Sequence, residues 1–266
     1  MSDWKTIVQI NDDSLRFVSK ILDSYIGTKF DPLFIQFYTL NINRRLVFIQ
    51  KGISPHLTEI EIKPQLELPI GILLRSACLD ILQYGYIIKC LDDVKIGNPP
   101  QPDVIPDYSS FNSELKKVFS GNIKNQIDDY KALKDVGMLS DAEFIEKERK
   151  FQEDFIWLYN NNDIEQSCPT RKIFRILKND SKYDVFSNIF EDYSYYSKLE
   201  HFGILSWIFT IPEKENIPLI LHRIKRNLMT ILHIYKISFV YLQRNDNDIA
   251  VLEEWSNQLS NLNEYK

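Results

Sequence analysis

The feature that most constrains the fold is a stretch, residues 69–91, that is apolar on nearly every side when drawn as a helix. Such a helix has to be covered by neighbours on all sides. Arg75 and Asp80 near its middle argue against a membrane span, because each charge costs about 2.5–3.5 kcal/mol at the centre of a bilayer. We therefore expect a central helix in a soluble protein.

Composition favours helices over strands throughout the chain. Only 8 of the 266 residues are glycine, so few positions can form the tight turns with positive φ that join short strands. Hydrophobic residues make up 44%, enough to build a core without disulfides or metals. We predict an all-α, multi-helix bundle that forms a single domain over residues 1–266.

A second long apolar pattern occupies residues 217–243. Its apolar positions recur at alternating steps of four and three residues: Ile217, Leu221, Ile224, Leu228, Ile231, Tyr235, Ser238 and Leu242. A heptad seam of this length packs lengthwise against another helix. We expect that helix either within the bundle or across a homodimer, and the pattern leaves both open.

Two segments between these helices interrupt the bundle pattern. Residues 94–110 are rich in proline and predict a long loop. Residues 111–160 predict an inserted helical hairpin, in which Ser140 and Glu143 form a capping box. Nearer the start of the sequence, Asp13 is the expected N-cap of a first helix.

Charge and cysteine usage limit the classes of partner and compartment. The formal net charge of -5 argues against affinity for nucleic acid over the whole surface but leaves room for a local basic patch. The three cysteines show no CxxC spacing and no signal peptide is visible, so we expect reduced thiols in a cytoplasmic protein. The four histidines lack metal-ligand spacing, so we expect neither a metal nor a cofactor.

The two charges of the central helix are the first candidate binding residues. Arg75 and Asp80 are five positions apart, about 140° round a helix, so their partners are expected on different neighbouring helices. A buried charge needs such a partner. One interpretation is a polar network that fixes helix register, and the other is a polar site lining a cleft.

A Tyr/Ser-rich stretch, residues 193–203, is the second candidate. It includes Tyr196, ends in Glu200-His201-Phe202-Gly203 and follows an apolar helix that carries an arginine and an acidic residue five positions later. This arrangement resembles helical proteins of the HEPN-like superfamily. The resemblance implies a bacterial protein of defence or toxin type that binds RNA, or cleaves it without a metal, using an arginine and a histidine that are separated by four to six residues near a dimer interface.

The stretch departs from that pattern in one respect. No arginine lies four to seven positions before His201, where Tyr195 and Tyr196 stand instead, with Lys198 three positions before the histidine. Non-catalytic relatives that bind nucleic acid or protein partners also occur in the superfamily. The alternative interpretation is a capped helix with an internally hydrogen-bonded histidine.

A third candidate lies in the heptad-patterned helix, on a face away from the seam. Arg226 and His233 are seven residues apart, two helical turns on one side. The residues that resemble the superfamily motif are Arg226 and Asn227 at one end and His233 and Tyr235 at the other, with His222, Arg223 and Lys225 forming a basic patch beside them. Histidine can move the proton of an RNA 2′-hydroxyl and arginine can neutralise phosphate. The alternative is a solvated helix face.

Two hypotheses from different classes therefore remain. In the first, the chain is a HEPN-like RNA-binding protein or ribonuclease whose catalytic residues are Arg226, Asn227 and His233, or His201 with a distant arginine. In the second, it is a non-catalytic helical scaffold that binds a protein partner. The sequence leaves open whether it is an enzyme.

Overall fold

The computed structural model describes residues 3–28, 35–93, 126–154, 170–200 and 217–262, and these ranges contain helices and turns but no strand. The helices are α1 (Asp3–Asp23), α2 (Ile35–Leu57), the short 3-10 helix η1 (Pro64–Leu66), α3 (Glu67–Asp93), α5 (Asp141–Asp154), α6 (Thr170–Lys178), α7 (Asp184–Ser187), α8 (Phe190–Glu200), α10 (Ile217–Tyr241) and α11 (Asp246–Ser260). The predicted all-α, multi-helix bundle is confirmed. The predicted loop at 94–110 lies outside the described residues.

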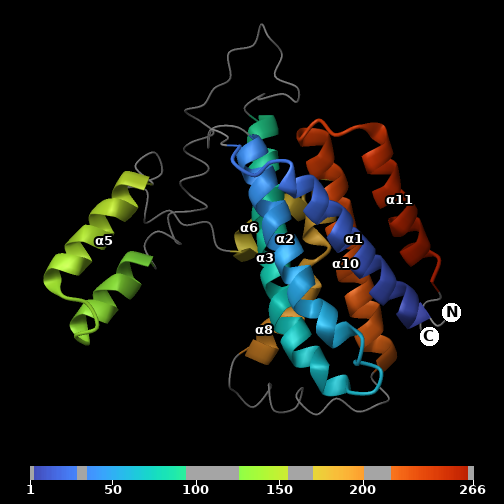
Figure 1. The fold of residues 1–266 in the computed structure, drawn as a ribbon, viewed down its shortest axis with the longest axis horizontal. Coiled ribbons are helices and arrows are strands. Elements are labelled where there is room, and N and C mark those ends of the chain that lie inside the picture. Colours follow the sequence, from blue (N-terminus) through green and yellow to red (C-terminus); the bar gives the residue numbers. More distant parts are fainter. Residues whose placement is uncertain (1–2, 29–34, 94–125, 155–169, 201–216, 263–266) are drawn as a thin grey trace, which may run out of the picture. The chain divides into compact units, whose positions relative to one another are not determined.

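The chain divides into two compact units. The first joins Met1–Gly85 to Leu177–Lys266, and the second is Tyr86–Ile176. The first unit holds the bundle of α1, α2, α10 and α11 with most of α3 (Figure 1). The expectation of one domain with an inserted hairpin stays a prediction.

The apolar stretch forms α3, whose residues up to Gly85 lie in the first unit. Ile70, Leu74, Ile81 and Leu82 are buried at successive turns, which covers the helix on more than one side. Polar contacts reach three different helices: α2 through Tyr84, α8 through Arg75 and α10 through Cys78. Neighbours therefore cover several sides of the helix, while Ile72 stays exposed at 40%.

The heptad seam of α10 lies inside the first unit. Its members Leu221, Ile224, Leu228, Ile231, Tyr235, Ser238 and Leu242 are all buried. The helix packs against α11, α2 and α1 (Figure 1). The pattern left open whether the seam packs within the bundle or across a homodimer, and the structure shows it packed within the bundle. A homodimer stays a prediction, and this seam would not form its interface.

The first helix begins earlier than its expected N-cap. The prediction of an N-cap at Asp13 is wrong, because α1 starts at Asp3 and Asp13 lies inside it, paired with Arg16 at 2.6 Å. Trp4 and Ile7 are buried, so the apolar face continues for a further two turns. Burial of these side chains outweighs the local capping preference of an aspartate.

The second unit contains the predicted capping box. The backbone N–H of Ser140 donates to the Glu143 carboxylate at 2.8 Å, and the N–H of Glu143 donates to Ser140 Oγ at 3.3 Å. Gly137, at φ +74°, ends the preceding helical residues 126–135, which α5 then follows. Over the described residues 126–154 two helical segments thus follow one another, and the predicted hairpin over 111–160 stays a prediction. No helix in the described ranges is long and apolar enough to cross a membrane.

Candidate functional site

Three arginines from two helices hold α8 in place. Arg226 of α10 binds Asp192 through two nitrogens, with Nε 2.8 Å from Oδ2 and Nη2 bonded to Oδ1. Its third nitrogen, Nη1, lies 3.0 Å from Glu191. The Asp192 side chain is 1% exposed and the Arg226 side chain 34%, so the inner half of the pair is shielded from water and the outer half is not.

Asn227 completes the binding of the buried carboxylate. Its amide nitrogen donates to Asp192 Oδ2 at 3.0 Å and to the carbonyl of Arg223 at 2.8 Å. Its amide oxygen accepts from Cys78 Sγ at 3.4 Å. Burial, and then the charge of Asp192, raise the pKa of the Cys78 thiol well above its usual value. That thiol stays protonated and is no nucleophile.

Arg223 is committed to a second buried pair. It binds Glu67 at the start of α3, and both side chains are almost completely buried. Its Nη2 also donates to Tyr195 Oη at 3.1 Å, with the guanidinium carbon 4.0 Å from the centre of that ring. Burial, and then the charge of Glu67, raise the pKa of Tyr195. The expected binding residue Arg223 therefore lies in the interior, not on a solvated face.

Arg75 of α3 contacts α8, the Tyr/Ser-rich helix. Its Nε donates to Ser197 Oγ at 3.1 Å, and its guanidinium carbon lies 5.5 Å from the centre of the Tyr193 ring. Ser197 is four positions before His201 in the sequence. His201 and the side chain of Glu200 lie outside the described residues.

Asp80 faces a different helix from Arg75. It binds Arg45 of α2 at 2.7 Å, and burial raises its pKa above the usual value despite that arginine. The two charges of α3 thus find partners on two different helices, as their angular separation of about 140° implies.

His233 and Tyr235 have separate surroundings. His233 lies two turns from Arg226, about 10 Å along α10, and is half-buried. Tyr235 is buried, and its hydroxyl donates to Gln50 Oε1 at 2.6 Å in a polar network with Ser14. Tyr196 is buried too, and within the described ranges its hydroxyl has no hydrogen-bond partner. Arg226 is engaged by α8, so it is not directed at His233.

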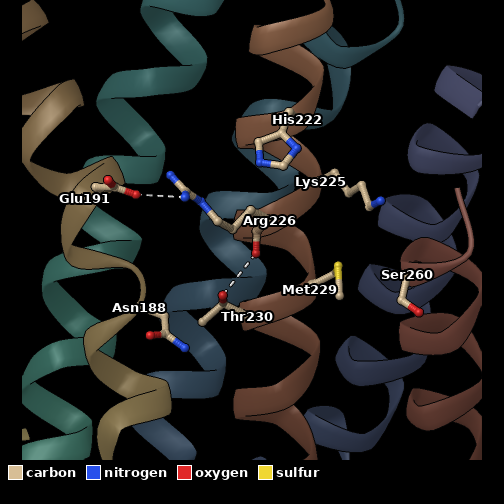
Figure 2. Close-up of a pocket in the computed structure, with 8 residues that line it drawn as sticks. All are labelled: Asn188, Glu191, His222, Lys225, Arg226, Met229, Thr230 and Ser260. Carbon is tan, nitrogen blue, oxygen red and sulfur yellow. Dashed lines mark hydrogen bonds and ion pairs between the residues drawn. The ribbon is translucent and has the colours of Figure 1, made fainter. Parts of the chain in front are cut away.

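A surface pocket of about 530 Å³ lies beside Arg226. Its lining residues are Asn188, Glu191, His222, Lys225, Arg226, Met229, Thr230 and Ser260 (Figure 2). Figure 2 shows Arg226 and Lys225 extending to opposite sides of α10, Arg226 toward Glu191 and Lys225 toward the side on which Ser260 lies. Lys225 donates to the carbonyl of Leu262 at 2.9 Å, just beyond the negative end of the α11 dipole.

Sequence reasoning identified only the basic part of this pocket. Positions 222, 225, 226, 229 and 230 share one face of a helix by their spacing, so Met229 and Thr230 could have been added to the candidates. The residues from other elements, Asn188, Glu191 and Ser260, carry no local signal. Nor do Asp192 and Glu67, the carboxylates that bind the arginines of α10.

In the part of the chain that the structure describes, no three histidine, cysteine, aspartate or glutamate side chains gather in a way that could hold a metal ion. Compared with known proteins, the chain matches no family model, no curated protein and no solved structure. The resemblance to the HEPN-like superfamily therefore stays a prediction.

Proposed function

We propose that the chain is a HEPN-like helical protein that binds RNA where Arg75 meets α8, and that His201 makes this site a metal-independent ribonuclease. The observation that supports this is the contact of Arg75 with Ser197 and Tyr193. In this proposal Arg75 takes the place of the arginine that the sequence around His201 lacks. Arg75 is partly exposed, as a residue that meets a ligand has to be.

The residue types suit RNA. A guanidinium binds a phosphate through two parallel hydrogen bonds, and an aromatic ring such as Tyr193 stacks on a base. In the cleavage step His201 takes the proton of the 2′-hydroxyl as its oxygen attacks phosphorus, and the 5′-oxygen leaves with a proton from water. Arg75 neutralises the charge that develops on the phosphate. The acidic net charge confines such binding to a local site.

The second arginine–histidine combination fits this chemistry less well. All three nitrogens of Arg226 are engaged by Asp192 and Glu191, and Asn227 is buried in the same network. An arginine held this way stabilises helix packing, and it offers a phosphate only its outward nitrogen, Nη1, and only once Glu191 is displaced. A catalytic role for Arg226, Asn227 and His233 remains the weaker form of the proposal.

The test is incubation of purified protein with total RNA in the presence of EDTA. We expect the wild type to cleave, Arg75→Ala and His201→Ala to lose cleavage, and His233→Ala to keep it. Arg16→Ala is the matched control, because Arg16 is a well-exposed arginine of α1 with only a local partner. Loss of cleavage in His233→Ala alone would place the catalytic site on α10. The molar mass in solution, from light scattering, tests the homodimer that the superfamily mechanism uses.

The second candidate function is a non-catalytic scaffold that binds a protein partner. It is favoured by the burial of Arg223 and Asn227 and by the pairing of Arg226, which give motif residues a structural task. A folded wild type that neither retains labelled RNA on a filter nor cleaves it would contradict the RNA proposal and leave the scaffold.

A further inference from the structure

We propose that the pocket beside α10 binds a dianionic phosphate group, either free phosphate or that of a small phosphate monoester. The pocket is distinct from the contact between Arg75 and α8, so this inference stands apart from the RNA proposal. Its volume of about 530 Å³ is within the usual range for small-molecule sites. Two cations, Lys225 and Arg226, and one carboxylate, Glu191, are among its lining residues.

Lys225 is the first observation. It is 8% exposed, yet within the described ranges its ammonium meets one main-chain carbonyl, that of Leu262, and no carboxylate. An ammonium has three donors, and a charge so far removed from water is costly unless it is neutralised. An anion in the pocket that Lys225 lines would supply both the missing acceptor and the missing charge.

The pair between Arg226 and Glu191 is the second observation. Nε and Nη2 of Arg226 face the buried Asp192, which leaves Nη1 as the outward nitrogen (Figure 2). Glu191 meets that nitrogen with a side chain that is 81% exposed. An ion pair exposed to this degree stabilises little, so a phosphate can displace the carboxylate while Asp192 keeps the guanidinium in place.

The other lining groups suit the same ligand. His222 stands on the face of α10 that carries Lys225 and Arg226, and within the described ranges no hydrogen bond engages its ring. Thr230 and Ser260 add hydroxyl groups. Met229 is the apolar residue among them and suits the organic part of a monoester.

Titration with inorganic phosphate, followed by NMR against chloride of equal ionic strength, tests the site. We expect saturable binding to the wild type, and binding tighter by about two- to fivefold in Glu191→Gln, which removes the competing carboxylate. Lys225→Met keeps the side-chain stem but not the charge, and should weaken binding by about tenfold or more. Lys236→Met is the matched control on the same helix, outside the pocket, and should bind as the wild type does.

Two further arms complete the test. Ser260→Trp narrows the pocket from an exposed position without changing charge, so it should weaken binding with no loss of fold. A titration with AMP distinguishes the sources, since tighter binding than phosphate indicates a monoester and equal binding indicates the free ion. The inference is overturned if phosphate fails to saturate the wild type, or if Lys225→Met and Ser260→Trp bind as Lys236→Met does.

Discussion

Arg226 of α10 and Asp192 of α8 form a two-bond ion pair in which the carboxylate is almost wholly buried and the guanidinium reaches the surface. Asp192 lies in the first turn of α8, where the helix dipole favours a negative charge. The pair therefore fixes both the position of α8 and the direction in which its remaining side chains point.

Removal of Arg226 is expected to destabilise the fold strongly. Arg226→Met leaves the buried Asp192 without its charge partner and should lower the free energy of unfolding by about 3 kcal/mol. This is at the lower end of the range for buried ion pairs, because the arginine is partly exposed. Adding Asp192→Asn should restore part of that loss, since no charge is then left buried. Urea unfolding measures both free energies. Glu191→Gln is the control, with a change of at most about 1 kcal/mol; equal losses in Glu191→Gln and Arg226→Met would contradict the account.

Two substitutions of Tyr195 separate the contributions that its hydroxyl and its ring make to the contact with Arg223. Tyr195→Phe removes the hydrogen bond from Nη2 but keeps the ring, and should cost about 0.5–1.5 kcal/mol. Tyr195→Leu also removes the ring from beneath the guanidinium and should cost about 0.5–2 kcal/mol more. Thermal unfolding of the two variants checks the order. Equal stability of Phe and Leu at this position would mean that the ring contributes nothing beyond its hydroxyl.

Gly85 and Gly52 should respond in opposite ways to alanine. A helical glycine replaced by alanine usually gains about 0.5–1 kcal/mol. At Gly85 the new Cβ would lie 2.4 Å from Phe186 Cγ and 2.6 Å from its Cβ, so α7 would have to move, at a cost of about 1–3 kcal/mol. At Gly52 the nearest atom is the end of the Leu73 side chain, which can rotate away. Chemical unfolding of Gly85→Ala and Gly52→Ala compares them, and a Gly85→Ala protein as stable as Gly52→Ala would refute the close packing.

Helices and caps could be predicted from the sequence where the signal is local. The apolar stretch at 69–91 and the heptad at 217–243 match α3 and α10 to within two residues at each end, because periodicity is a property of neighbouring positions. The capping box at Ser140 needs only four consecutive residues. The expected N-cap at Asp13 failed because burial of Trp4 extends the helix past it.

The partners of the charged residues could not be predicted in the same way. Arg226 binds a residue 34 positions earlier, and Arg223 one that is 156 positions earlier. No local pattern encodes such pairs. Because Arg223 and Lys225 are neighbours in the sequence, they suggest a single basic surface. In the structure Arg223 pairs with Glu67, whereas Lys225 donates to the carbonyl of Leu262.

The half-buried His233 should make stability depend on pH near neutrality. Burial, and then the charge of Lys236, lower its pKa from 6.5. The unfolded chain then binds a proton more readily than the folded one, so the contribution of His233 to stability is present above pH 6.5 and is lost as pH falls through the lowered pKa. His233→Asn lacks this dependence. We expect the free energy of unfolding of the wild type, relative to His233→Asn, to fall between about pH 8 and pH 5, and the fall to shrink when Lys236→Met is added to both proteins. A difference that stays constant over this range would show that His233 titrates alike in the folded and unfolded chains.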